Sequence, residues 1–359
     1  SRVAIRYGDE GGLDKDGVME IRRGVPDLDL GKSHYAQVRI MVDDSHYLKG
    51  MAVYSDDIPK GYDVVFNTNK KSGTPKMKVL KPIKDDPDNP FGASIKANGQ
   101  STYIGEDGKE HLSPINKLKE EGDWDTMAKN LSSQFLSKQP VKLLKQQLDL
   151  TVADRKAEYD EIMQYDNPTI RKKLLLDFAD TCEGNSMTLK ASSFPGQATK
   201  VILPLSKIGE RECYCPTYPD GTQLALVRFP HAGTFEIPIV TVNNKNLSGR
   251  RNLGNVQDAI GINAKVAERL SGADFDGDTV VAIPKSSKVD IKSTPALKDL
   301  KDFDPKIAYA VPEGNPNGVR LMKKEEKQKE MGIISNLITD MTLRGAPEGD
   351  IARAVKHSM

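Results

Sequence analysis

The chain has 359 residues, which by length corresponds to two or three domains, each large enough to bury a core. With 52 Lys and Arg against 51 Asp and Glu, the net charge of +1 neither demands nor excludes a nucleic-acid partner, because such surfaces are local. Three cysteines cannot build a disulfide framework and no apolar run reaches the ~20 residues of a membrane span, so composition excludes small secreted scaffolds and membrane proteins and predicts a reducing, cytoplasmic setting.

Residues 1–30 contain several glycines among many charged residues, with only a weak strand signal near residues 3–6. We expect them to form a flexible lead-in. The chain starts with Ser1 rather than Met and ends at Met359 inside a helical pattern, which predicts that the natural chain is longer.

Residues 31–123 show a β pattern. Three short apolar runs, at residues 38–42, 51–54 and 63–66, are separated by turn-forming residues. Strands of this length and spacing predict a small barrel. Residues 81–123 are rich in Pro, Asn, Gly and charge, so we expect a long insertion in this first barrel domain.

Between residues 124 and 189 the apolar period changes from two to about 3.6. Leu143, Leu144 and Leu148 fit one helical pattern, and a second covers residues 169–180. These residues predict a helical connector between two β domains.

Residues 190–290 return to a β pattern and predict a second barrel domain. Its expected strands are residues 200–203, 223–228, 235–237, 239–242 and 279–283. Residues 291–359 are expected to form a linker and C-terminal helices. The expected fold class is therefore α+β, with two barrel domains joined by a helical connector and followed by a helical segment. No internal repeat is visible, although two β domains that flank helices are compatible with distant copies.

The run Ala273-Asp274-Phe275-Asp276-Gly277-Asp278 leads directly into the apolar stretch 279–283. In an extended chain every second side chain points the same way, so the three aspartates would share one side. Clustered carboxylates repel one another unless a cation neutralises them, and hard oxygen ligands suit Mg²⁺. Gly277 permits close approach of backbone or substrate. The run therefore predicts a magnesium site.

Two other structures could carry such a run. A calcium loop of the EF-hand type also starts with alternating aspartates, but its glycine would fall at Thr279 and its glutamate at Lys285, and a strand follows where a helix is required. A solvated acidic turn is the other alternative. The apolar strand directly after Asp278 disfavours it, because solvated turns do not usually sit against a core strand.

The run from Ala273 to Asp278 resembles the NADFDGD signature of the beta-prime subunit of multisubunit RNA polymerases, shared in variant form by single-chain phage and prophage polymerases and by eukaryotic RNA-dependent RNA polymerases. Upstream, Leu226-Val227-Arg228-Phe229-Pro230-His231 resembles the family's LNRAPTLH strand, and Ile262-Asn263-Ala264-Lys265-Val266 resembles the stretch before the aspartates. Residues 193–204 resemble the opening strand of the same barrel. Order and spacing agree from residue 193 to residue 278.

The first β domain resembles the other half of that catalytic centre. The run His46-Tyr47-Leu48-Lys49-Gly50-Met51-Ala52 and residues 57–59, 63–67 and 73–75 are similar to the beta-subunit motifs HGxKG, DMP, VDIVLNP and GVPSRM. Gly332-Ile333-Ile334-Ser335-Asn336 resembles an LGIIAN helix of eukaryotic-type RNA-dependent polymerases. The resemblance implies a double-psi β-barrel in each half, and two barrels on one chain favour the single-chain branch, of phage, prophage or mobile-element type.

The resemblance further implies template-directed RNA synthesis, in which nucleoside monophosphates pass from NTPs to an RNA 3′-hydroxyl by a two-metal mechanism. Asp274, Asp276 and Asp278 would hold Mg²⁺ and, together with Lys49, form the catalytic set. Arg228 would contact the ribose or phosphates of the nucleotide. The implied partners are a DNA or RNA template, the RNA product and NTPs, and neither a membrane nor an oligomer is expected.

The sequence departs from the family's pattern in three places. Gly272 stands where the family's ribose-reading Asn precedes Ala-Asp, so ribonucleotide selection must use another group or be weaker. The second lysine of the first barrel has no clear counterpart, and Arg39 is the nearest cation. No long trigger loop is visible before Met359. Arg39, Gly272 and Gly277 are expected to border the substrate.

Two alternatives share these residues. Members that copy DNA and members that copy RNA have the same core, so the template stays open. A barrel that binds nucleic acid or another protein without catalysis is the alternative of a different class, and the presence of all three aspartates disfavours it. Nucleotide incorporation that requires Mg²⁺ distinguishes an enzyme from such a binding module.

Overall fold

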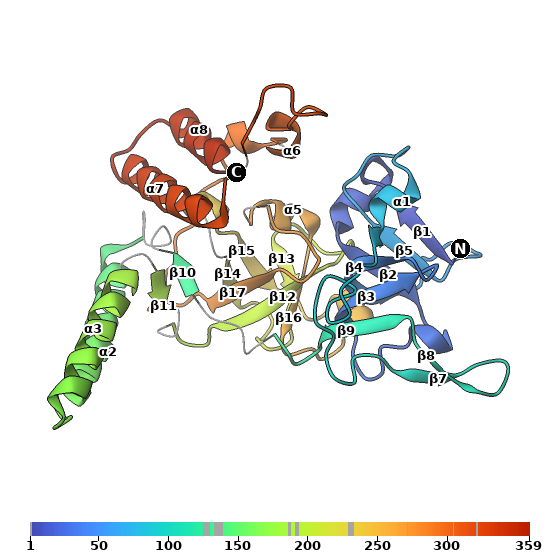
Figure 1. Cartoon of the computed structure of the whole chain (residues 1–359). Coiled ribbons are helices and arrows are strands. Elements are labelled where there is room, and N and C mark those ends of the chain that lie inside the picture. Colours follow the sequence, from blue (N-terminus) through green and yellow to red (C-terminus); the bar gives the residue numbers. More distant parts are fainter. Residues whose placement is uncertain are drawn as a thin grey trace.

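The protein is described from a computed structural model of the whole chain (Figure 1). The residues that the structure describes are 2–124, 130–132, 139–185, 188–190, 194–228, 233–270, 272–303, 305–320 and 322–359. Two β units lie side by side, and a helical hairpin projects from the second unit (Figure 1). None of the described helices is long and apolar enough to cross a membrane.

The first unit is a seven-stranded sheet with the spatial order β1-β5-β2-β4-β3-β9, in which β6 also pairs with β4. Its strands are β1 (Val3–Arg6), β2 (Val18–Arg22), β3 (Tyr35–Val42), β4 (His46–Ser55), β5 (Val64–Asn67), β6 (Lys81–Pro82) and β9 (Ile115–Glu120). β1 is parallel to β5 and β2 is parallel to β4, whereas the other neighbours in this order are antiparallel. Ile21, Val38 and Ile40 belong to one buried cluster that forms its core.

Residues 2–30 belong to this sheet, in contrast to the flexible lead-in expected from the sequence. β2 lies between β5 and β4 near the centre of the sheet, and Val3 and Met19 are buried in its core. The intervening segments form three 3-10 turns, η1 (Gly8–Glu10), η2 (Gly12–Lys15) and η3 (Pro26–Leu28). Strands of four and five residues between glycine-rich turns contain too few apolar positions to stand out in the sequence.

The second unit is a closed barrel of six strands in the order β12-β16-β13-β15-β14-β17, with β17 paired back to β12. The strands are β12 (Ala198–Pro204), β13 (Glu212–Tyr214), β14 (Gln223–Val227), β15 (Ile239–Val242), β16 (Ala259–Ile262) and β17 (Thr279–Pro284). The barrel predicted for this part of the chain is confirmed. Residues 235–237 were expected as a strand, but Phe235 lies in the 3-10 helix η6 (Thr234–Glu236) and packs against the C-terminal helices instead.

Both units have the same strand order. If their six main strands (β1 to β5 with β9, and β12 to β17) are lettered a to f along the chain, each unit has the order a-e-b-d-c-f, with a–e and b–d parallel and the other neighbours antiparallel. In the second unit f pairs with a and closes the barrel, whereas β9 and β1 do not pair in the described part of the first unit. One closed barrel and one open sheet of the same order therefore stand where the sequence predicts two barrels.

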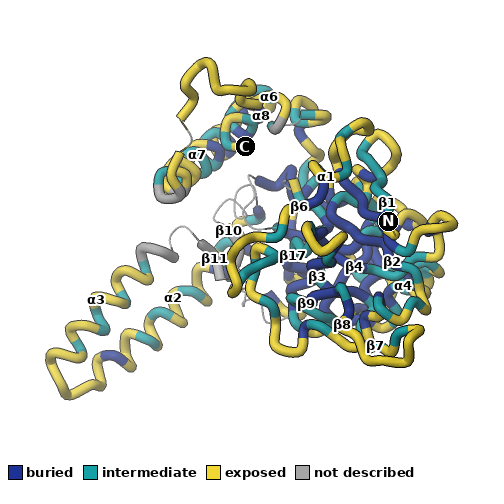
Figure 2. The backbone as a smooth tube through the Cα atoms, turned by 45° about the vertical axis from the view of Figure 1, so that its right-hand side comes forward, coloured by how far each residue is buried: buried dark blue, intermediate teal, exposed yellow. Residues whose placement is uncertain are grey.

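The helices lie outside these β units. α2 (Val141–Met163) and α3 (Pro168–Asn185) form a hairpin that extends away from both units, and most of its residues are exposed (Figure 2). β10 (Asn130–Ser132) pairs with β11 (Thr188–Lys190) at its base. The remaining elements are α1 (Lys76–Val79), β7 (Thr102–Ile104), β8 (Glu110–Leu112), α4 (Leu247–Leu253), α5 (Ala264–Glu268), η7 (Lys298–Leu300), α6 (Pro305–Ala308), α7 (Lys324–Leu343) and α8 (Glu348–Ser358).

The two β units share a buried interface. Val18 of β2 belongs to the core cluster of the barrel, and Tyr35 and Trp124 belong to a second cluster that contains barrel residues. The carboxylate of Asp258, 1% exposed, accepts hydrogen bonds from the Tyr35 hydroxyl and from the backbone nitrogens of Gly122 (2.6 Å) and Trp124 (3.2 Å). Packing and a satisfied buried carboxylate thus fix how the first unit faces the barrel.

Candidate active site

The three aspartates occupy the loop between α5 and β17. One carboxylate oxygen from each of Asp274, Asp276 and Asp278 lies within 4.8 Å of the other two, and all three residues are half-buried. Phe275 between them is 3% exposed and packs in the barrel core. Phe275 therefore anchors the loop in the barrel core, and the alternating aspartates bring their carboxylates into one cluster.

Hydrogen bonds inside the loop fix its shape. The backbone nitrogen of Asp274 donates to the carboxylate of Asp278, and that of Asp276 donates to the carboxylate of Asp274, each over 3.1 Å. Gly277 has a φ of +125°, and a β-carbon there would lie 2.5 Å from the side-chain nitrogen of Gln37. The backbone conformation therefore favours glycine at this position, and a larger residue would also displace the Gln37 side chain.

The first β unit also holds the loop. The carbonyl of Asp16 accepts a hydrogen bond from the backbone nitrogen of Phe275, and the side chain of Gln37 donates one to the carbonyl of Asp276, both over 3.0 Å. The backbone of Gly17 lies so close that a β-carbon on it would be 2.8 Å from the Asp276 β-carbon. Sequence analysis missed these three residues, because no local motif marks them and only the packing of the two units brings them to the aspartates.

Two cations reach the carboxylates, one from each β unit. Nζ of Lys49, on β4, lies 3.5 Å from Oδ2 of Asp276, and a guanidinium nitrogen of Arg228, directly after β14, lies 3.0 Å from Oδ2 of Asp278. The Lys49 and Arg228 side chains are 41% and 24% exposed. The structure thus brings the three aspartates, Lys49 and Arg228 together in a partly open site.

Arg39 lies opposite Lys49 in the β3–β4 ladder and is 6% exposed. Its guanidinium donates to the carbonyls of Val38 (3.2 Å) and Phe91 (3.3 Å), and it forms no ion pair with any residue the structure describes. Burial lowers the pKa of Arg39, and the charge of Asp276 counteracts part of that shift. Arg39 therefore adds positive charge beside Lys49 without a carboxylate of its own.

Gly272, at the start of the loop, is exposed and has a φ of +69°. Among the described residues, no atom lies within 4 Å of the place that a β-carbon would take. The space beside Gly272 is therefore open to a larger side chain as far as the described residues are concerned.

Burial raises the pKa of Asp274 to about 7, and its hydrogen bond with Asp276 and the charges of Asp276 and Asp278 contribute to the same shift. At neutral pH the cluster consequently tends to hold a proton unless a cation takes its place. Three half-buried carboxylates within one ion's reach are the oxygen donors that Mg²⁺ prefers, so the residues present fit this metal. The strand β17 directly after the loop is incompatible with an EF-hand, and the buried Phe275 is incompatible with a fully solvated turn.

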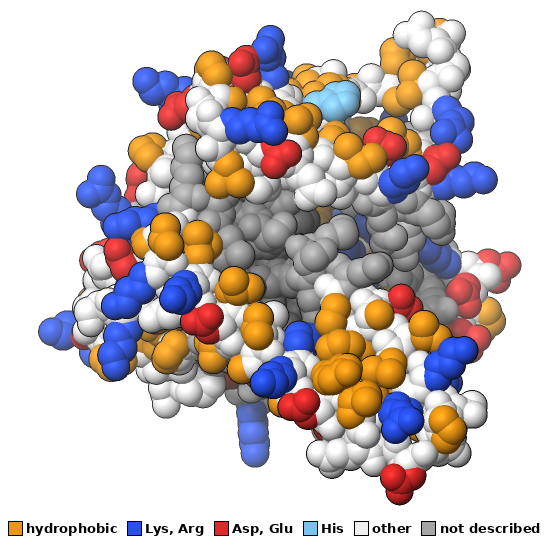
Figure 3. All heavy atoms as spheres, turned by 90° about the vertical axis from the view of Figure 1, so that its left-hand side faces the viewer, with side chains coloured by type: hydrophobic (Ala, Val, Ile, Leu, Met, Phe, Trp, Pro, Cys, Tyr) orange, Lys and Arg blue, Asp and Glu red, His pale blue; other side chains and the backbone are white. Residues whose placement is uncertain are grey.

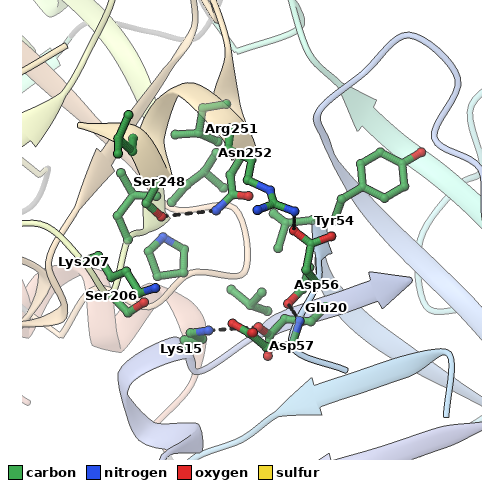
Figure 4. Close-up of a pocket in the computed structure, with 18 residues that line it drawn as sticks. Lys15, Glu20, Tyr54, Asp56, Asp57, Ser206, Lys207, Ser248, Arg251 and Asn252 are labelled. Carbon is green, nitrogen blue, oxygen red and sulfur yellow. Dashed lines mark hydrogen bonds and ion pairs between the residues drawn. The ribbon is translucent and has the colours of Figure 1, made fainter. Parts of the chain in front are cut away.

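A hollow of about 250 Å³ lies elsewhere between the two units and contains none of the aspartates of the loop (Figure 4). Arg251 of α4 pairs with Asp56 of the first unit over 2.6 Å, and Lys15 pairs with Glu20 over 2.9 Å. Because these acidic and basic side chains pair with one another, the hollow offers a bound ion less unbalanced charge than the loop does.

Neither a family model nor a curated protein matches the sequence. Among solved structures, the chain is similar to the RNA-dependent RNA polymerase QDE-1 from Thielavia terrestris, with a TM-score of 0.47 and 13% sequence identity. The match covers 99% of this chain and 42% of that polymerase, so the chain spans less than half of its length. A likeness at this level assigns neither a fold nor an activity to the chain.

Proposed function

We propose that this chain is a nucleotidyltransferase that extends RNA on a nucleic-acid template, with Mg²⁺ held by Asp274, Asp276 and Asp278. The observation that carries the proposal is the grouping of three carboxylates within 4.8 Å together with Lys49 and Arg228. The resemblance of the loop to the signature of multisubunit RNA polymerases supports the same reaction. Transfer joins the RNA 3′-oxygen to the α-phosphorus of an NTP and breaks that phosphorus's bond to pyrophosphate.

Each residue of the cluster has a role that follows from its chemistry. Mg²⁺, when bound, neutralises the carboxylates and the phosphates and orients the reacting oxygens. Asp274, Asp276 and Asp278 supply its oxygen ligands. Lys49 and Arg228 reach the same point from opposite β units, so they can neutralise the negative charge that grows on the phosphate oxygens during transfer. Gly277 allows the loop to lie against the first unit, and Gln37 holds it there.

Arg39 is positively charged, so we expect it to bind the triphosphate and not to take part in binding Mg²⁺. Its guanidinium is buried beside Lys49 and forms no ion pair with a described carboxylate, so an incoming anion would relieve part of the cost of burying that charge. The planar donors of arginine also match phosphate oxygens in pairs. We therefore assign Lys49 and Arg39 to the triphosphate and Arg228 to the ribose or the α-phosphate.

The shared strand order supports the expected double-barrel architecture. The first sheet repeats the order and the parallel pairs of the closed barrel and lacks only the closing pair. We therefore regard the units as two copies of one double-psi barrel, the first of which has opened. Such a pair on one chain is the arrangement of single-chain polymerases.

Extension of a labelled RNA primer on matched DNA and RNA templates, with Mg²⁺ titrated from zero, tests the proposal. We expect incorporation that depends on Mg²⁺ and on Asp276 but not on Asp44, an exposed turn aspartate for which Asp44→Asn is a matched control. The template that supports extension decides between DNA-directed and RNA-directed synthesis. Binding of nucleic acid without incorporation at any Mg²⁺ concentration would make the chain a binding module and overturn the proposal.

A further inference from the structure

One face of helix α2 is apolar and exposed. Val141, Leu148, Val152, Tyr159 and Met163 are 79%, 62%, 55%, 42% and 42% exposed. At 3.6 residues per turn, these five side chains fall within about 60° of the helix circumference and extend over about 33 Å of its length. They form an apolar stripe, interrupted by Lys145 between Val141 and Leu148, of a kind that monomeric soluble proteins rarely leave uncovered.

The stripe repeats every eleven residues. Val141 is followed at that spacing by Val152 and Met163, and Leu148 by Tyr159. The charges on one flank of the stripe repeat with the same period, namely Lys145 and Lys156, and Asp149 and Asp160. Eleven residues make slightly more than three turns, so this period gives a seam that drifts only slowly around the helix, as in long helix-to-helix contacts.

We propose that the stripe on α2 pairs with the same stripe on a second copy of this chain, with the two helices antiparallel. A two-fold axis that passes between Val152 and Ala153 places Lys145 of each copy level with Asp160 of the other. The same axis places Asp149 level with Lys156. Because a two-fold axis perpendicular to the helices brings identical flanks together, Lys145 and Lys156 each meet an aspartate, whereas Lys142 on the same flank is level with Met163.

A parallel pair does not give this match. In that arrangement the charged flank of one copy meets the opposite flank of the other, which carries Leu144, Thr151 and the ion pair Arg155–Glu158 (2.7 Å). The charge pattern therefore specifies the antiparallel orientation, and the apolar stripe supplies the burial that stabilises the dimer.

Most of the stripe and its charges are exposed, although the ring of Tyr159 contacts the ring of Phe178 on α3, with 6.1 Å between the centroids. Lys145, Asp149, Lys156 and Asp160 are exposed, and none of them forms an ion pair within the described residues. The hairpin extends well beyond the β units (Figures 1 and 2), and the face from which it projects shows hydrophobic side chains among Lys and Arg (Figure 3). In the antiparallel dimer the two bodies lie at opposite ends of the paired helices. The sequence alone predicted no oligomer.

Sedimentation equilibrium of the full chain tests the dimer. We expect the parent to dimerise and Val152→Glu, which places like charges next to the two-fold axis, to weaken dimerisation by more than about tenfold. Leu176→Glu on α3, where Leu176 is 59% exposed outside the stripe, is the matched control and should leave the dimer intact. A parent chain that stays monomeric at submillimolar concentration would overturn the proposal. If Val152→Glu then weakens nucleic-acid binding, the stripe belongs to nucleic acid instead.

Exchange of the charges tests the orientation separately. The double variant Lys145→Asp, Lys156→Asp sets aspartate against aspartate in the antiparallel dimer and should dissociate it. Adding Asp149→Lys and Asp160→Lys restores opposite charges at every pair and should return the affinity to within about threefold of the parent. A dimer that ignores the double variant, or that the fourfold variant does not restore, excludes the antiparallel pairing.

Discussion

The side-chain nitrogen of Gln37, on β3 of the first β unit, donates a hydrogen bond over 3.0 Å to the carbonyl of Asp276 at the centre of the aspartate loop. Gly277 makes this contact possible, because a β-carbon there would lie 2.5 Å from the same nitrogen. The position of the carboxylates in the barrel thus depends on the other unit. Because both β units hold the aspartate loop, a substitution that alters how the units pack should also move the carboxylates, even if it replaces no aspartate.

Gln37→Ala should lower the turnover of RNA extension by about five- to tenfold, because a lost hydrogen bond of about 1 kcal/mol lets the loop move away from its productive position. The measurement is kcat at saturating NTP together with the Mg²⁺ concentration at half-maximal rate, which should rise. Gln223→Ala, at an exposed position of β14, is the control and should change neither. An unaltered Mg²⁺ requirement in Gln37→Ala would show that this contact does not position the loop.

Asp276→Asn should reduce nucleotide incorporation by more than about a hundredfold while the fold stays intact. The change removes one metal ligand, and it also relieves repulsion within the cluster, so the metal-free variant should melt no lower than the parent. Thermal melting with and without Mg²⁺ checks both statements, since Mg²⁺ should stabilise the parent and not the variant. Near-normal elongation by Asp276→Asn would rule out the assigned metal site.

The raised pKa of Asp274, about 7 against an ordinary 3.8, links stability to pH. Between these values the folded chain binds more protons than the unfolded chain, so this contribution to stability is present at low pH and is lost as pH rises through about 7. Because Mg²⁺ replaces the proton, stabilisation by Mg²⁺ should grow between about pH 5.5 and about pH 8. The melting temperature of Asp274→Asn should depend less on pH than that of the parent, and equal dependence in the two would contradict the shift.

The sequence predicts well where a signal is local. The run from Asp274 to Asp278 contains its own alternation, and β3, β4, β12 and β17 are apolar enough to be seen without a structure. β1, β13 and β16 have only three or four residues each, and the parallel pair β1–β5 joins residues 3 and 64. A period of two indicates a strand but not its partner, so the common order of the two units required the structure.

Part of the site is also invisible to sequence motifs for a chemical reason. Asp16 contributes a backbone carbonyl, which every residue has, and Gly17 contributes the absence of a side chain. Lys49 and Arg228 could be connected with the aspartates only through the family resemblance, since 225 or more residues separate Lys49 from each of them along the chain. Composition alone does not predict that Lys49 or Arg228 contacts the aspartates.

Lys49→Ala should lower kcat by about a hundredfold or more and leave template affinity within about twofold, because its partner is charge that develops in the transition state. Single-turnover extension and equilibrium template binding separate the two effects. Lys60→Ala, at an exposed turn of the same unit, is the control for loss of one positive charge. Equal losses of rate and template affinity would make Lys49 a contact to nucleic acid rather than to the reacting phosphates.

Gly272→Asn should test sugar selection with less strain than most substitutions. The φ of +69° at this position is one that Asn tolerates better than most residues, and no atom of the described residues lies within 4 Å of the new β-carbon. If the side chain reaches the ribose 2′-hydroxyl, it adds a polar contact that a deoxynucleotide leaves unpaired, worth about 1 to 3 kcal/mol or roughly tenfold to a hundredfold in preference.

The measurement is the ratio of specificity constants for ATP and dATP in the parent, in Gly272→Asn and in Arg228→Ala. We expect the ratio to rise in Gly272→Asn and to fall in Arg228→Ala, because Arg228 is the donor that we assign to the ribose or the α-phosphate. A parent that already discriminates strongly, with a ratio that neither substitution changes, would place ribose recognition on other groups.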